Sequence, residues 1–160
     1  MKRSFRIPTR LPCSSWRPWL TVWLPWVLWM ALIYVVSAQP EVPGPGEKGS
    51  LLRDLFNYGA HAASYALLAL LSWRAARSAT PWLPCWVVRH PGWAAGVWSA
   101  LYAISDEYHQ SLVPGRTASL WDLAVDLAGI AVVLALLAYG EPRWTAVRRL
   151  LSRRLGLDRG

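Results

Sequence analysis

No charged side chain occurs in residues 19–36, WLTVWLPWVLWMALIYVV, and this absence constrains the fold more than any other feature of the sequence. A helix on the surface of a soluble protein needs a polar outer face, which this stretch lacks, whereas roughly 20 mostly apolar residues suffice to cross a bilayer. Four apolar segments are recognisable, at 19–38, 57–76, 92–108 and 118–139. The sequence therefore predicts an all-α, membrane-embedded bundle of four transmembrane helices.

The second and third of these segments are shorter or more polar than the first and fourth. Helices that face the interior of a bundle can carry polar groups, because neighbouring helices satisfy them. We therefore expect all four segments to span the membrane within one domain at 19–139. A chain of 160 residues has room for one such domain.

The basic residues of the chain are distributed unevenly around these segments. The formal net charge is +8, with 17 Lys and Arg. Most of them lie before the first apolar segment, around the second connection or after the fourth segment, whereas the first and third connections hold few. This positive-inside distribution predicts that both termini are cytoplasmic. Because the charge marks one side of a membrane, we expect no nucleic-acid partner.

Both ends of the chain have their own character. Residues 1–18 are basic and broken by prolines. Together with the first apolar segment they resemble a secretory signal with a cleavage pattern at 36–38. The apolar part is longer than in such signals, which favours an uncleaved span. Residues 140–160 predict a basic amphipathic helix on the anionic cytoplasmic leaflet, or equally a solvated helix that orients the protein. Cys13 and Cys85 both fall on the cytoplasmic side, where we expect free thiols.

Polar side chains gather at the predicted outer ends of three segments. In the four-span topology the second helix starts outside, the third ends outside and the fourth starts outside. The side chains expected to line one ligand-binding site there are His61, Asp106, Glu107, His109, Gln110, Arg116, Ser119, Asp122 and Asp126. Their convergence from separate segments is the strongest functional signal in the sequence.

Helical spacing orders the polar residues of the third segment. Asp106, His109 and Gln110 share a face, and Glu107 points about 100° away from it. An alternative role for the two acids is that of solvated residues at a helix end. Carboxylates interact unfavourably with the helix dipole at a C-terminal end, and this favours a functional role for them. His61 lies among alanines and has no neighbour in sequence to bond it.

The fourth segment places Ser119, Asp122 and Asp126 on one face, with Gly129 a turn further along, where it would let another helix approach closely. The first two residues also match a capping pattern, so helix capping is an alternative role for Asp122. Capping cannot explain Asp126, which lies beyond the first turn. An ionised Asp in hydrocarbon costs about 2.5–3.5 kcal/mol, so it needs a partner, for which Arg116 or a histidine is available.

These residues permit more than one chemistry. Glu107, Asp122 and Asp126 are candidate acids or bases for work on a lipid-linked substrate, and Arg116 suits a phosphate or carboxylate. The same acids are able to bind a divalent cation. Because no spacing equals a known metal motif such as H-E-x-x-H, the sequence predicts no metal site and no cofactor.

The stretch SDEYHQSLVPGRTASLWDLAVDLAG at 105–129 closely resembles the signature of VanZ-like membrane proteins. That pattern runs Ser-Asp-Glu-x-x-Gln, then Pro-Gly-Arg, then an Asp and a later Asn or Asp ahead of a Gly. The matching residues are Ser105, Asp106, Glu107, Gln110, Pro114, Gly115, Arg116, Asp122, Asp126 and Gly129. A second mark is a His that starts the second helix with a Tyr four residues later, here His61 and Tyr65. The resemblance covers about residues 20–139.

The resemblance implies a small, four-helix integral membrane protein that acts on the outer envelope and influences susceptibility to the glycopeptide teicoplanin. The chain departs from the family at one position. The family usually carries a Lys three residues before the His, and here that position is Tyr58. If that Lys balances the acids or holds an anion, Arg53 or Arg116 substitutes for it, or the role is altered.

Three functions stay open at this point. The protein binds an envelope lipid or glycolipid headgroup at its outer site, or it is an enzyme that modifies such a lipid by carboxylate acid–base chemistry, or it is a structural or assembly protein whose polar groups hold the bundle together. The bilayer itself, and anionic lipid at the C-terminal tail, are the other expected partners.

Overall fold

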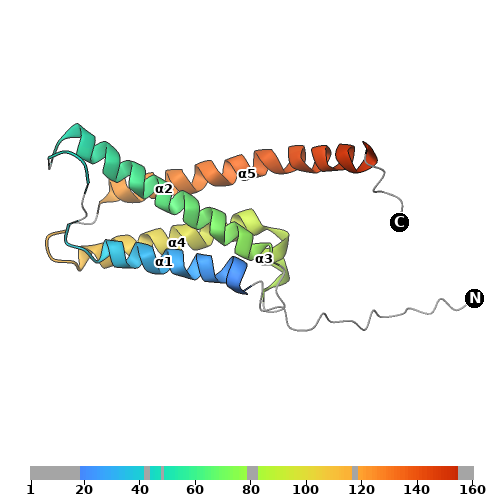
Figure 1. Ribbon diagram of the computed structural model, residues 1–160. Coiled ribbons are helices and arrows are strands. Elements are labelled where there is room, and N and C mark those ends of the chain that lie inside the picture. The colour runs from blue at the N-terminus through green and yellow to red at the C-terminus, as the bar shows by residue number, and fades with distance from the viewer. Residues whose placement is uncertain (1–18, 42–43, 48, 79–82, 117–118, 155–160) are drawn as a thin grey trace, which may run out of the picture.

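The computed structural model describes residues 19–41, 44–47, 49–78, 83–116 and 119–154. Every regular element among these residues is a helix (Figure 1). The elements are the π-helical turn η1 (Trp19–Trp23) and the α-helices α1 (Leu24–Ser37), α2 (Leu51–Ala76), α3 (Cys85–Arg89), α4 (Pro91–Ser111) and α5 (Leu120–Arg154). The predicted all-α class is confirmed. The predicted basic segment 1–18, which contains Cys13, lies outside the described residues.

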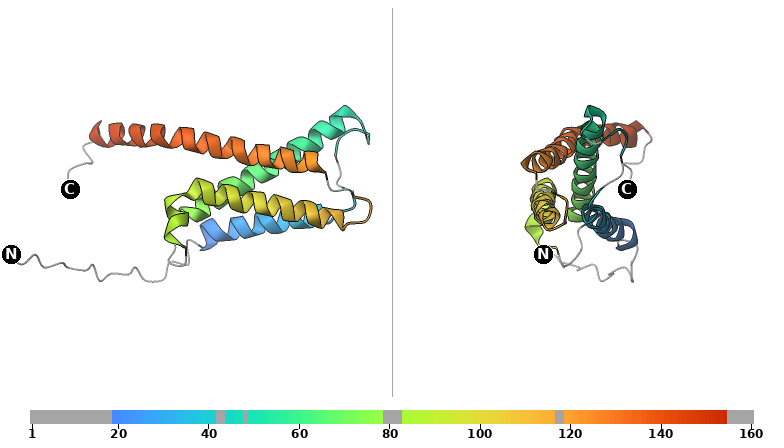
Figure 2. Two further views of the ribbon diagram at one scale, coloured as in Figure 1. Left: turned by 180° about the vertical axis from the view of Figure 1, so that it is seen from behind. Right: turned by 90° about the vertical axis from the view of Figure 1, so that its left-hand side faces the viewer.

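Four long helices, α1, α2, α4 and α5, make up the bundle, and α2 is its central element because it packs against the other three. The connections from α1 to α2 and from α4 to α5 lie at the same end of the bundle, and the short helix α3 lies at the opposite end (Figures 1 and 2). This up-and-down arrangement brings the start of α2, the end of α4 and the start of α5 together.

In the part of the chain that the structure describes, two helices are long and apolar enough to cross a membrane. They contain the windows Leu20–Ser37 and Leu120–Gly140, with mean hydropathies of 1.8 and 2.2. Only 11% and 17% of the residues in these windows are buried inside the protein, whereas the core helix of a soluble protein would be mostly buried. Their large apolar side chains face outward, where lipid accommodates them without the cost of contact with water.

The predicted second and third spans correspond to α2 and α4, which do not pass the same test among the described residues. Their lengths of 26 and 21 residues suffice for a bilayer, but polar side chains lower their hydropathy. Several of these are buried, namely Ser72, Ser99, Asp106, Glu107 and Gln110. That α2 and α4 also span the membrane stays a prediction.

The close approach of α2 and α5 depends on one glycine, as its spacing predicted. A Cβ atom added at Gly129 would lie 3.0 Å from the Cα and carbonyl carbon of Ala62, and closer still to its carbonyl oxygen. Next to this contact lies the hydrophobic core, which consists of Ile33, Tyr65, Leu68, Ala69, Ala103 and Ile130. The helix contact therefore fixes the two elements that carry His61 and Asp126.

The C-terminal tail, predicted as a basic amphipathic helix over 140–160, is helical to Arg154 but belongs to α5. Helix α5 continues without a break through Gly140 and Pro142 to Arg154. Neither Gly140 nor Pro142 ends the helix, and the backbone is helical on both sides of them. The tail thus extends the axis of the last apolar segment, and residues 155–160 lie outside the described residues.

We expect Gly129→Ala to lower the free energy of unfolding by about 1–3 kcal/mol, the usual cost of forcing a side chain into a filled interior. The obstacle is the backbone of Ala62, which has no rotamer to change. Thermal unfolding of the purified protein in detergent measures the effect. The matched control is Gly59→Ala, because an added Cβ there meets nothing within 4 Å; equal melting temperatures for both variants would contradict the prediction.

Chemical labelling of Cys85, an exposed cysteine at one end of the bundle, tests the predicted topology. In intact cells, an impermeant thiol reagent should label Cys85 only after the membrane is opened. In a cysteine-free background, Glu47→Cys at the opposite end should react without permeabilisation. The reverse pattern would place the connection from α1 to α2 in the cytoplasm.

Candidate functional site

A cavity of about 650 Å³ opens at the end of the bundle where α1 meets α2 and α4 meets α5. Six of the nine predicted site residues line it, namely His61, Asp106, Gln110, Arg116, Ser119 and Asp122. Glu107, His109 and Asp126 do not line it. The structure therefore brings most of the predicted residues to one cavity and leaves the remaining three outside its lining.

Asp106 joins three helices. One oxygen of its carboxyl group, Oδ2, accepts hydrogen bonds from Ser37 Oγ at 2.9 Å, from Tyr65 Oη at 3.0 Å and from Gln110 Nε2 at 3.0 Å. The donors belong to α1, α2 and α4, and all four residues are buried. Because buried polar groups without partners are costly, this network fixes how the three helices meet.

Asp126 pairs with His61 across α2 and α5. The His61 Nδ1 atom lies 3.1 Å from Asp126 Oδ1, so a histidine, rather than Arg116, is the partner that the sequence required. Asp126 is fully buried, with 0% of its surface exposed. Its second oxygen, Oδ2, has no hydrogen-bond partner among the described residues.

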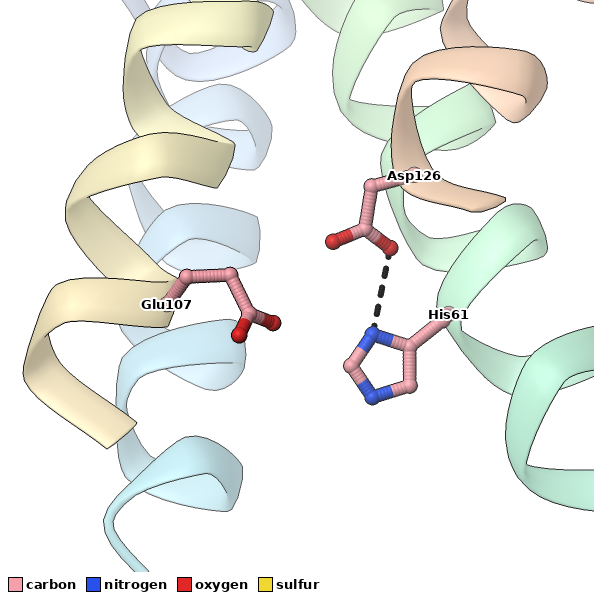
Figure 3. Close-up of side chains that lie close together, drawn as sticks. All are labelled: His61, Glu107 and Asp126. Atoms are coloured by element: carbon pink, nitrogen blue, oxygen red, sulfur yellow. Dashed lines mark hydrogen bonds and ion pairs between the residues drawn. The ribbon is translucent and has the colours of Figure 1, made fainter. Parts of the chain in front are cut away.

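Glu107 lies on the turn that also carries Asp106 but points toward α5, as the predicted 100° offset requires. Its Oε2 atom accepts a hydrogen bond from the backbone N–H of Ser119 at 2.9 Å. The other oxygen, Oε1, is buried and has no partner in the described part of the chain. Figure 3 shows this carboxyl group facing the His61–Asp126 pair, and one ligand atom from each of the three residues lies within 4.8 Å of the others.

The remaining predicted residues have separate roles in the structure. Arg116 donates a long hydrogen bond from Nη1 to the carbonyl oxygen of Ser37, at 3.4 Å. Ser119 accepts from the N–H of Asp122 through its hydroxyl, at 3.3 Å, so Ser119 caps α5, while the Asp122 residue lines the cavity. His109 lies apart from the cavity and stacks on Tyr34 of α1, with ring centroids 4.3 Å apart.

Several residues that line the cavity were not among the predicted site residues, and Arg53 was expected only as a substitute for the usual family Lys. Arg53 and Asn57 precede His61 by two turns and one turn of α2, so all three share a helix face. That spacing is visible in the sequence, but Arg53 precedes the predicted membrane segment 57–76 and Asn57 is its first residue. Ser37 carried no comparable signal, since its role depends on where the end of α1 lies relative to α4.

The family model described as VanZ/LLP1 matches residues 19–140. The chain belongs to the VanZ/LLP1 family. The match extends from the start of η1 to the apolar part of α5, and it confirms the resemblance inferred from the 105–129 signature. Searches of curated proteins and of solved structures gave no significant match.

Membership of the VanZ/LLP1 family and the two outward-facing apolar helices together identify a membrane protein in a lipid bilayer. The family mark on α2 has a structural meaning in this chain. His61 bonds Asp126 of α5, and Tyr65, one turn later, bonds Asp106 of α4. The two residues of this mark therefore connect α2 to α5 and α4, the helices that carry the 105–129 signature.

We expect Tyr65→Phe to lower the free energy of unfolding by about 1 kcal/mol, because it removes one donor from the buried Asp106 carboxyl group. The control is Tyr108→Phe on α4, where the side chain is 69% exposed. Chemical unfolding in detergent compares the two variants. A Tyr65→Phe protein as stable as the control would mean that this hydrogen bond does not hold α2 to α4.

Proposed function

We propose that this VanZ/LLP1 protein binds the headgroup of a cell-envelope lipid or glycolipid in the cavity at the outer end of the bundle. The proposal rests on one observation, which is that apolar and polar residues line different sides of the cavity. Helix α1 contributes apolar side chains, Trp29, Leu32, Ile33 and Val36, whereas the other elements contribute mainly polar ones. An amphipathic ligand satisfies both surfaces, because its chains lie against α1 and its headgroup lies against the polar groups.

The polar lining suits a headgroup that carries hydroxyl groups as well as an anion. Carboxyl and amide groups of Asp122, Asn57 and Gln110 accept or donate hydrogen bonds as sugar hydroxyls require. Arg53 and Arg116 supply guanidinium groups, whose fork geometry matches a phosphate. A phosphate-bearing glycolipid fits this combination better than a lipid with a phosphate alone, because its sugar hydroxyls can also donate hydrogen bonds to the acids of the cavity.

The departure of the chain from the family pattern supports the same assignment. Tyr58, which replaces the usual Lys, lines the cavity together with Arg53 and Arg116. Either arginine therefore supplies the positive charge that the missing Lys would bring. An influence on teicoplanin susceptibility, which the family resemblance implies, follows if the bound lipid belongs to the surface that a glycopeptide must reach.

Enzymatic modification of such a lipid is the second candidate function. One specific observation favours it, which is that two buried carboxyl oxygens near the His61 ring, Glu107 Oε1 and Asp126 Oδ2, have no partner among the residues that the structure describes. Paired acids and a histidine are the groups that general acid–base catalysis uses. In this alternative His61, which lines the cavity, is the link between the acids and the ligand.

Incubation of the purified protein with total envelope lipid and peptidoglycan-precursor lipids, followed by mass spectrometry, tests both functions. We expect a retained lipid in the wild-type protein and about tenfold less in Arg116→Gln, since a charge-assisted contact contributes about 1.5–3 kcal/mol. The matched control is Arg89→Gln, because Arg89 is exposed on α3 at the opposite end and should retain the lipid normally.

The same experiment separates the alternatives. A product formed by the wild-type protein and absent with Asp126→Asn would identify an enzyme and name its substrate. An unchanged lipid that the wild-type protein retains would identify a binding protein. If neither a product nor a retained lipid is found, the polar residues hold the bundle together and the proposed binding function is wrong.

A further inference from the structure

His61, Glu107 and Asp126 form a cluster whose members come from three different helices, α2, α4 and α5 (Figure 3). Each offers one nitrogen or oxygen atom, and these atoms all lie within 4.8 Å of one another. Ligands around a four-coordinate ion such as Zn²⁺ lie roughly 3.4 Å apart, given bond lengths of about 2.1 Å. Small side-chain rotations therefore suffice to bring the three atoms around one ion.

The hydrogen bonding of the cluster is incomplete in a way that points to a cation. Glu107 and Asp126 expose only 7% and 0% of their surface. Each uses one oxygen, toward the Ser119 N–H and toward His61 respectively, and each leaves one buried oxygen without a partner within the described ranges. A buried carboxyl oxygen without a hydrogen bond is costly and requires an explanation. One cation between the two acids satisfies both oxygens.

No Lys or Arg side chain supplies that cation in the described part of the chain. Arg116 directs Nη1 to the carbonyl oxygen of Ser37 on α1, and no Lys or Arg is paired with either acid there. His61 contributes a nitrogen atom instead, which is a ligand for a metal ion as well as a partner for Asp126. The cluster thus has the donor atoms of a metal site.

The donor atoms also indicate the class of metal. Ca²⁺ and Mg²⁺ take oxygen ligands almost exclusively, whereas one imidazole nitrogen with two carboxylate oxygens suits a first-row ion such as Mn²⁺ or Zn²⁺. Three protein ligands leave at least one coordination position for water or for an oxygen of a bound molecule.

The surrounding structure holds the three ligands in place. The contact between Gly129 and the backbone of Ala62 fixes α5 against α2, one residue from His61 and one turn from Asp126. The N–H of Ser119 orients the Glu107 carboxyl group. Groups that orient metal ligands in this way raise metal affinity, because the ligands lose little freedom on binding.

We propose that His61, Glu107 and Asp126 bind one divalent ion of the Mn²⁺ or Zn²⁺ class beside the cavity. This site goes beyond lipid binding and does not depend on it. Because His61 also lines the cavity, an ion bound here would lie next to the cavity wall.

The test uses the full-length protein in detergent, stripped of metal with EDTA and titrated with Mn²⁺ in the absence of lipid. The EPR signal of free Mn²⁺ reports binding, and we expect one ion per chain, displaced by Zn²⁺. Glu107→Gln and Asp126→Asn should each weaken binding by at least about tenfold, the loss that even supporting residues cause. Glu47→Gln, at an exposed loop residue outside the cluster, should bind normally.

One measurement needs no variant and so does not depend on how well the substituted proteins fold. Pulsed EPR of the wild-type Mn²⁺ complex should detect coupling to one imidazole nitrogen. The proposal is overturned if the folded wild-type protein binds neither Mn²⁺ nor Zn²⁺ stoichiometrically, or if the bound ion has no nitrogen ligand. Because no lipid is present, that result would leave the lipid-binding proposal untouched.

Discussion

The bundle depends on a single buried oxygen atom. Asp106 Oδ2 accepts hydrogen bonds from side chains of α1, α2 and α4, so three helices meet at one point near the end of the bundle. In an environment that offers little water, each of these polar groups needs a protein partner. Any shift of one helix along another would break at least one bond, and the network therefore fixes the register of the bundle.

That register determines where the functional groups lie. Glu107 follows Asp106 in sequence, so when Asp106 faces α1 and α2, Glu107 is turned toward the start of α5. Tyr65 and His61 stand one turn apart on α2, and the first binds Asp106 while the second binds Asp126. The hydrogen bonds of Asp106 and the proposed metal ligands therefore lie next to each other, and both depend on the same packing of the helices.

The cavity and the cluster also suit each other chemically. The lining combines apolar residues of α1 with arginines and acids, and its acids alone would disfavour an anionic headgroup. A divalent ion beside His61 would reduce this repulsion and provide a coordination position for a headgroup oxygen. The two proposals thus reinforce each other, although each is open to a separate test.

The sequence by itself determined the helical class, the two strongly apolar helices, the close contact at Gly129 and six of the residues that line the cavity. These features depend on hydropathy, helical period and the 105–129 signature, which are local properties of the chain. Only the tertiary structure decided that His61, and not Arg116, is the partner of Asp126, that His109 stacks on Tyr34 away from the cavity, and that His61, Glu107 and Asp126 form one cluster. The physical reason is that such contacts depend on the relative rotation and depth of separate helices, which side chains far apart in sequence fix together.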